Sequence, residues 1–407
     1  MRVRRTISWA ESWEPAALFF LVAMAMGIWF VPLSTVLDAH GFSEIKPYAF
    51  ATAAIAAFVS PLIFGAMADR HLGPVRVLRW LAVATAGGMA LASTAIKFHW
   101  PPWLVLGTIQ LHALCAAPMW SISTTIVLSR LQDAQQEFGP LRAMATVGWM
   151  SGCWLVSALN ADTSTLAGYS SAVTWLVVAA FTLLLPSVAP PKSAEHLTLR
   201  QRLGLDALAL LKHPDHRAVF LTSALAAIPL SAFYPFTPPH LRALGLEHTT
   251  AWMTLGQATE IVAMFSLGGL LTKWRLKWIF AVGLGCALLR YLLCALDVKA
   301  WVLAGVTLHG FAFTLFFVTA PIYLDGHVDP AWRARAQALM ALMTMGVGSL
   351  FGYLGSGWWF KVCARPNGIR WSLFWGGLAA AVTLVLIYFL TTYRGQGAAA
   401  KRSGDQQ

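Results

Sequence analysis

Long apolar stretches separated by short polar ones dominate the chain. About 20 consecutive apolar residues are enough for a helix to cross a bilayer, and twelve stretches meet or approach that length. The predicted spans are residues 16–37, 48–68, 75–96, 102–129, 141–160, 169–188, 217–240, 250–271, 277–296, 300–323, 335–360 and 371–393. The pattern therefore predicts an all-α membrane protein with twelve transmembrane helices.

The longest polar stretch, residues 189–216, divides these spans into six and six. A glycine followed by cations closes the second span of each half, at Gly65 and Gly269. Paired halves of this kind are typical of secondary transporters, and in the major facilitator superfamily fold they are related by a pseudo-two-fold axis. We expect an N-terminal six-helix half (1–188), a cytoplasmic central loop (189–216), a C-terminal six-helix half (217–394) and a cytoplasmic tail (395–407).

Composition excludes most other protein classes. Of the 407 residues, 58% are hydrophobic and 11% are charged, against about 25% charged in a soluble domain. The sequence has no Walker loop, calcium loop, HExxH or GxSxG with partners, which argues against an ATP-driven pump and predicts no enzyme activity, metal or cofactor. A membrane enzyme or receptor would need a polar catalytic cluster or a sizeable soluble domain, and the sequence offers neither. The five cysteines lie mostly in apolar runs, as packing residues do.

The net charge of +12 invites a nucleic-acid partner, but its distribution argues against one. If the N-terminus is cytoplasmic, the inner segments hold about three times as many Lys and Arg residues as the outer loops. That bias is the positive-inside rule. It predicts both termini in the cytoplasm of a bacterium and a multi-pass protein of its inner membrane. We expect this protein to be surrounded by lipid and to be monomeric.

A conspicuous inner loop follows the second span. It runs from Gly65 through Asp69 and Arg70 to Gly73 and is similar to the signature loop of the major facilitator superfamily. The similarity implies that Asp69 latches the cytoplasmic gate, with Arg70 as its companion. The alternative is a positive-inside loop with a helix-capping aspartate.

Charges inside the spans are costly, so each needs a partner, a cavity or a function. Glu260 lies near the middle of the eighth span, and Gln257 lies on the same face at i−3. An amide and a carboxyl side by side suit hydrogen bonding to a polar solute or proton transfer. The alternative is a structural ion pair between Glu260 and Arg290 of the ninth span.

A second group of candidate residues lies at the start of the fifth span. Arg142, Thr146 and Trp149, at i, i+4 and i+7, form a stripe along one face of the helix. A cation, a hydroxyl and an indole on one stripe suit an aromatic ligand that forms hydrogen bonds. Equally, Arg142 could snorkel to the inner surface while Trp149 serves in packing.

Two histidines lie within spans. His309 is followed by Phe313 at i+4, and His112 lies in the fourth span. Histidine titrates near physiological pH, so either could carry a proton, and for His309 a functional role is favoured. The alternative, favoured for His112, is a neutral ring bonded to a backbone carbonyl or a hydroxyl. Trp29 in the first span could line a cavity.

Several stretches together resemble the bacterial nucleoside–proton symporters of the major facilitator superfamily. The resemblance covers nearly the whole chain and is strongest over 139–149, 203–212, 257–260, 289–290, 309–313 and 329–337. It implies that the substrate, a nucleoside, lies at the membrane midplane between the two halves. It also implies the substrate contacts Arg142, Thr146, Trp149, Gln257, Glu260 and Phe313.

This chain departs from the family pattern at a few positions. A glutamine and an asparagine of the seventh span align with Ser231 and Tyr234, a tyrosine of the tenth span becomes His309, and an acidic residue after Phe313 becomes Thr314. We therefore expect a secondary transporter that imports nucleosides with protons by alternating access, with Glu260 or His309 carrying the proton. The alternative substrate is another polar solute, such as a sugar, a glycoside or a muropeptide-like compound.

Overall fold

The computed structural model describes residues 9–68, 73–131, 134–187 and 198–395. Contacts divide the chain into two compact units. Unit 1 comprises Met1–Ile45, Val59–Glu195 and His248–Ala251, and unit 2 comprises Lys46–Phe58, His196–Glu247 and Trp252–Gln407.

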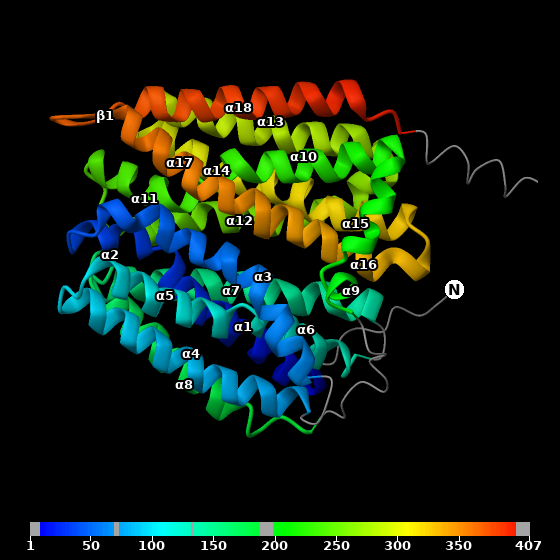
Figure 1. Ribbon diagram of the computed structural model, residues 1–407, viewed down its shortest axis with the longest axis horizontal. Helices are drawn as coiled ribbons and strands as arrows, with labels where there is room; N and C mark the ends of the chain where they lie inside the picture. Colours follow the sequence, from blue (N-terminus) through cyan, green and yellow to red (C-terminus); the bar gives the residue numbers. More distant parts are fainter. Residues whose placement is uncertain (1–8, 69–72, 132–133, 188–197, 396–407) are drawn as a thin grey trace, which may run out of the picture. The chain divides into compact units, whose positions relative to one another are not determined.

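Unit 1 is a helical bundle. Its elements are α1 (Trp9–Phe30), α2 (Leu33–Ala39), η1 (Ser43–Ile45), α4 (Pro74–Lys97), α5 (Pro102–Ala116), α6 (Met119–Leu128), α7 (Ala134–Ala158) and α8 (Leu166–Phe181), together with the second part of α3 (Lys46–Ala68). Helix α1 packs along α7, and α4 packs along α5 and α8. Figure 1 shows α4 and α8 running side by side.

Glycines let α1 and α7 approach closely. A Cβ at Gly148 would overlap the backbone of Phe20, and one at Gly152 would overlap the carbonyl of Met24. A Cβ at Gly27 of α1 would lie 2.8 Å from the carbonyl oxygen of Trp149. Small residues at such a crossing give membrane helices their van der Waals contact, and here they fix the face that α7 presents.

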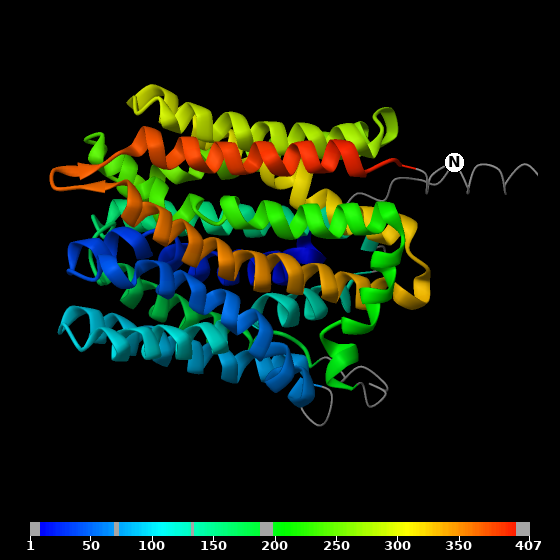
Figure 2. The same cartoon turned by 45° about the horizontal axis from the view of Figure 1, so that its top comes forward.

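Unit 2 is also helical. Its elements are α9 (Leu199–Arg202), η2 (Leu205–Lys212), α10 (Pro214–Leu230), α11 (Phe233–Ala243), α12 (Thr249–Lys273), α13 (Leu276–Ala295), α14 (Lys299–Ala312), η3 (Phe313–Val318), α15 (Thr319–His327), α16 (Pro330–Ala341), η4 (Leu342–Gly348), α17 (Ser349–Cys363), β1 (Ala364–Arg365), β2 (Gly368–Ile369) and α18 (Trp371–Thr392). Helices α13 and α18 pack against each other (Figure 1), and α10 packs along α17 and α18 (Figure 2).

Three spans of unit 2 are interrupted. Pro229 lies just before the break between α10 and α11, and the Tyr291 hydroxyl donates to the Pro229 carbonyl at 2.7 Å. The other two interruptions, η3 and η4, are stretches of π-helix. Such π-bulges occur frequently at functional sites. Here η3 begins at Phe313, one of the predicted site residues.

Nine of the twelve predicted spans coincide with long apolar helical runs. In the described part of the chain, nine helical runs are long and apolar enough to cross a membrane. The ranges 48–68 and 141–160 fall on α3 and α7, which have 23 and 25 residues, while 169–188 falls on the shorter apolar helix α8. Two details were not predicted: α9 and η2 within the central loop, and the β1–β2 hairpin before α18.

Candidate functional site

In unit 1, the predicted stripe on α7 begins with a stacked arginine. The Cζ atom of Arg142 lies 4.4 Å from the ring centroid of Trp120 on α6. Trp120 in turn stacks on Phe19 of α1, with centroids 5.4 Å apart and planes inclined at 19°. The half-buried guanidinium of Arg142 therefore rests on an aromatic platform, a contact that the sequence did not predict.

The rest of the stripe faces α1 and the interior of unit 1. Thr146 is buried. The half-buried Trp149 ring meets Phe30 edge-on with centroids 6.1 Å apart, and a Cβ at Gly27 would lie 3.3 Å from it. Trp149 thus has a packing role, whatever else it contacts.

The structure supports the interpretation of His112 as a ring bonded to a backbone carbonyl. Its Nδ1 atom lies 3.2 Å from the carbonyl oxygen of Thr85, and its ring meets Trp29 edge-on at 6.3 Å. Because a carbonyl can only accept, Nδ1 carries the hydrogen. His112 is a buried ring bonded to the backbone, as favoured from the sequence.

In unit 2, α12 and α14 are in backbone contact beside the predicted acidic site. A Cβ at Gly310 would overlap the backbone nitrogen of Glu260 and the carbonyl of Gly256. The Thr259 hydroxyl donates across the contact to the Thr307 carbonyl at 2.5 Å. This contact places Glu260, which is 8% exposed, on the helix facing His309.

Gln257 and His309 meet the aromatic start of α11. Gln257 Nε2 donates to the Tyr234 hydroxyl at 3.1 Å. The His309 ring stacks on Phe233 with centroids 4.2 Å apart and planes within 9°, and meets Tyr234 edge-on at 5.7 Å. Four residues of the predicted site thus belong to one cluster, since Phe313 also stacks on His309 at 6.1 Å.

Some buried polar atoms of this region have no hydrogen-bond partner among the described residues. They are Gln257 Oε1, Thr314 Oγ1, and Nε and Nη2 of Arg290. An unpaired polar group in a protein interior costs free energy and therefore requires an explanation. A bound polar ligand is one way to supply the missing partners.

Arg290 of α13 bonds to His309. Its Nη1 lies 2.8 Å from His309 Nδ1, and its Cζ lies 4.6 Å from the Phe233 centroid. From the sequence, Arg290 had been considered as a partner for Glu260, so this contact with the histidine is a finding of the structure.

Ser231 contributes little to the cluster. It follows α10, and its hydroxyl donates back to the Ala227 carbonyl at 2.7 Å. Such back-bonding to the preceding turn is common for serine in helices. The remaining predicted residues, Asp69 and Arg70, lie outside the described residues.

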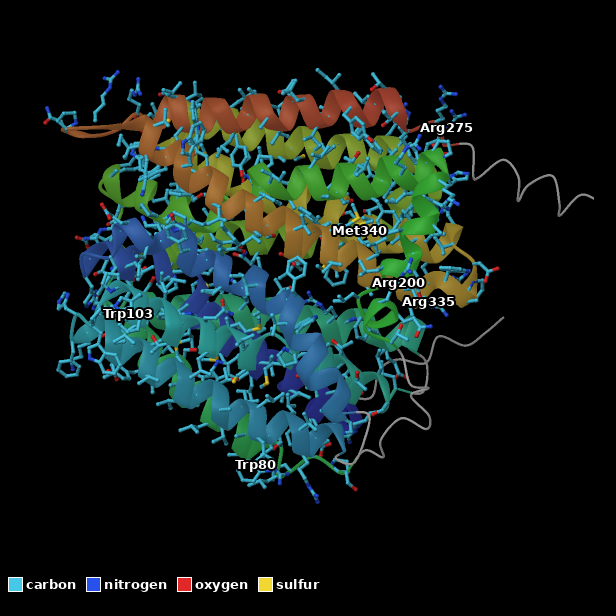
Figure 3. All side chains as sticks on the ribbon, in the orientation of Figure 1. Trp80, Trp103, Arg200, Arg275, Arg335 and Met340 are labelled. Atoms are coloured by element: carbon cyan, nitrogen blue, oxygen red, sulfur yellow. The ribbon has the colours of Figure 1, made fainter. Side chains whose placement is uncertain are left out.

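Cations gather at one end of unit 2. Figure 3 shows Arg200 of α9, Arg275 before α13 and Arg335 of α16 at the same end of its helices. All three belong to segments that the charge count assigned to the cytoplasm. In the part of the chain that the structure describes, no group of three His, Cys, Asp or Glu side chains could hold a metal ion.

Sequence reasoning missed Trp120 and Phe233, and it gave Arg290 a different partner. The only signal for Phe233 was its place beside Tyr234, just after the break that follows Pro229. Trp120 had no signal beyond its residue type, because nothing in the chain tells which helix faces α7.

Comparison with known proteins gives consistent results. A family model described as "Nucleoside H+ symporter" matches residues 15–397. The Escherichia coli (strain K12) protein named "Putative nucleoside transporter YegT" is 31% identical over 403 residues, which cover 93% of this chain and 92% of that protein. The xanthosine permease of the same organism is 24% identical over 91% of this chain and 93% of its own length.

Solved structures share the fold. A crystal structure of the nucleoside transporter NupG superposes with a TM-score of 0.84 at 22% identity, covering 94% of this chain and 99% of that one. The POT family transporter PepTSo superposes with a TM-score of 0.70 at 13% identity, covering 94% of this chain and 97% of that one. The fold is therefore that of an all-helical membrane transporter. With the family model matching nearly the whole chain, this protein belongs to the nucleoside H+ symporter family.

Proposed function

We propose that this protein imports nucleosides together with protons by alternating access. It is a transporter rather than an enzyme, and it works as a monomer in a bacterial inner membrane. Family membership supports the class of solute and the coupling ion.

The observation that carries the proposal is the cluster of Tyr234, Gln257 and His309. These side chains meet within membrane-spanning helices, and Gln257 Oε1 is buried without a partner among the described residues. Aromatic rings beside unpaired polar atoms suit a solute with a flat ring and hydrogen-bonding edges. In our proposal, Gln257 and Glu260 bind base edges or sugar hydroxyls, while Phe313 stacks on the ring.

Unit 1 contributes Arg142, Thr146 and Trp149 in this proposal. The guanidinium of Arg142, oriented by Trp120, binds an oxygen of the solute. Thr146 adds a hydroxyl, and Trp149 adds an aromatic face. Ser231 has the smallest role, since its hydroxyl is already bonded to its own helix.

The membrane arrangement follows from the helices and the charges. We propose twelve spans, with α3, α7 and α8 completing the nine apolar runs, in two six-helix halves that the central loop separates along the sequence. The basic end of unit 2 in Figure 3 supports a cytoplasmic location for that end, and hence for both termini. Asp69 and Arg70 then form part of the cytoplasmic gate.

Uptake by proteoliposomes tests the transport cycle. We expect labelled uridine or adenosine to accumulate when the outside is made acidic. Replacing Glu260 with Gln should abolish this accumulation, because a neutral amide does not take up and release a proton. Exchange of internal for external nucleoside should remain, because the amide keeps the hydrogen bonds. Accumulation that persists in the variant would exclude Glu260 as the proton carrier.

A competition experiment separates nucleosides from other polar solutes. Ser231, Tyr234 and Thr314 differ from the family pattern, and this difference favours a sugar, glycoside or muropeptide-like compound as the second candidate. Unlabelled nucleosides should block uridine uptake, whereas sugars and glycosides should not. Binding of a sugar or glycoside but of no nucleoside would refute the proposal.

A further inference from the structure

The surroundings of Arg290 hold its side chain in one orientation. It is 2% exposed, and its guanidinium lies between two rings, with Cζ 4.6 Å from the Phe233 centroid and 4.7 Å from that of Tyr291. Phe233 is also the ring on which His309 stacks. The arginine and the histidine are therefore oriented by the same aromatic residue, and they bond to each other at 2.8 Å.

We infer that Arg290 is a positioning residue, which fixes the hydrogen of His309 on Nε2 and thereby makes His309 a permanent hydrogen-bond donor. A guanidinium has five N–H donors, no acceptor, and is not deprotonated in proteins. The atom that it contacts, Nδ1, must therefore accept. The ring hydrogen of His309 then resides on Nε2, and adding a second one would point an N–H at a cation.

This assignment separates two roles that the sequence left together. His309 serves binding through Nε2–H, and the proton passes through Glu260. The charged or titratable groups on the helices packed against the ring include Arg290 from α13, Tyr234 from α11 and Glu260 from α12, whose backbone nitrogen lies against Gly310. Of these, Glu260 is a carboxyl group, which can carry a proton at the pH at which such a transporter works.

The orientation of the ring also restricts the ligand. Stacking within 9° of Phe233 fixes the ring plane, and the bond to Arg290 fixes its rotation within that plane. The Nε2–H group then points in one direction, and it suits an acceptor atom such as a base carbonyl, a ring nitrogen or a sugar oxygen. This part rests on the proposed function, which supplies the nucleoside.

Nitrogen NMR of the reconstituted protein tests the tautomer without any ligand. In protein labelled with ¹⁵N-histidine, the signal that disappears in His309→Gln belongs to His309. We expect that signal to report the Nε2–H form throughout pH 5.5–8. In Arg290→Met the ring hydrogen should no longer be confined to Nε2, so the signal should change with pH. Arg290→Lys should restore the pH-independent signal, because lysine keeps both the charge and a donor. A signal that titrates in the wild-type protein, or one that reports hydrogen on Nδ1, would overturn the inference.

Binding and transport give the second readout. The amide nitrogen of glutamine can stand near the position of Nε2, so His309→Gln should weaken uridine binding less than His309→Ala does, and the uptake that remains should still be driven by a proton gradient. His309→Ala should weaken uridine binding by about 3- to 10-fold, the range expected for one hydrogen bond. Loss of accumulation in His309→Gln with exchange intact would make His309 the carrier and refute the inference. Wild-type protein that binds neither uridine nor adenosine would instead refute the proposed function, and the NMR result would still decide the tautomer.

Discussion

Two arginines of this protein lie on aromatic rings, and they differ in how far water reaches them. Arg142 of α7 is half-buried over the ring of Trp120. Arg290 of α13 is buried between the rings of Phe233 and Tyr291 and bonded to His309. The contact between guanidinium and ring is nearly the same, at 4.4 Å in one case and 4.6 Å in the other.

We propose that burial, more than contact geometry, separates a binding role from a positioning role. A half-buried guanidinium keeps part of its hydration and can exchange water for an arriving solute. A buried one acts on what it already touches, because electrostatic interactions are stronger in a medium of low dielectric constant. We therefore assign solute binding to Arg142 and the orientation of a neighbour to Arg290.

The largest effect should separate the two arginines directly. We expect Arg142→Met to weaken uridine binding by about 10- to 100-fold, because it removes a charged donor to the solute itself, and such a hydrogen bond is worth about 1.5–3 kcal/mol. Arg290→Met should weaken it by about 3- to 10-fold, no more than His309→Ala does, because Arg290 acts on the solute only through one hydrogen bond of His309. Isothermal titration calorimetry of the purified variants measures both values.

The pair Arg290→Lys and Arg142→Lys is the matched control. Lysine keeps the charge in both variants, and the affinity should recover further at position 290, where one donor to His309 suffices. Equal losses in the two methionine variants would break the comparison and show that burial does not distinguish the two roles.

The sequence predicted the spans but not these contacts. Apolar length is a property of one segment, so the helices appear where the pattern placed them. The stripe of Arg142, Thr146 and Trp149 followed from spacing within one helix. The contacts of Arg142 with Trp120 and of His309 with Phe233 join different helices, and spacing along one helix does not tell which neighbour its face meets.

The interruptions in the helices were also not predicted from the sequence. The π-helical stretch η3 begins at Phe313, and nothing in its composition differs from ordinary helix. Gly256 and Gly310, by contrast, could have been recognised as a close approach, because small residues mark such crossings in membranes. Spacing and resemblance therefore named candidate residues one at a time, while Phe233, Trp120 and the assembly around Arg290 could not be predicted.

A second prediction concerns Tyr234, whose ring lies against His309. Tyr234→Phe removes the hydroxyl that accepts from Gln257 Nε2 and keeps the ring beside His309. We expect uridine binding to weaken by about fivefold, within the range of one neutral hydrogen bond. Phe233→Tyr is a control that leaves the Gln257 bond in place. Unchanged affinity in Tyr234→Phe would mean that uridine binding does not depend on the hydrogen bond between Gln257 and the Tyr234 hydroxyl.

A third prediction tests the aromatic platform of unit 1. Trp120→Leu removes the ring beneath Arg142, and a cation–π contact at a partly exposed site is worth about 0.5–1 kcal/mol. Uridine binding should therefore weaken by about two- to fivefold. In the double variant with Arg142→Met, the two losses should not multiply, because each removes the same contact. Fully multiplicative losses would show that Trp120 acts independently of Arg142.

The smallest effect on uridine affinity is expected at Ser231. Its hydroxyl already donates to the Ala227 carbonyl, and a Cβ at Gly352 would lie 2.7 Å from the serine oxygen. Ser231→Ala removes only that oxygen from a tight helix contact, so uridine affinity should change less than about twofold, the range of an ordinary surface substitution. If alanine instead weakens binding as strongly as Tyr234→Phe does, the serine hydroxyl must turn towards the solute during transport. The cluster around Arg290 would then extend across the break between α10 and α11.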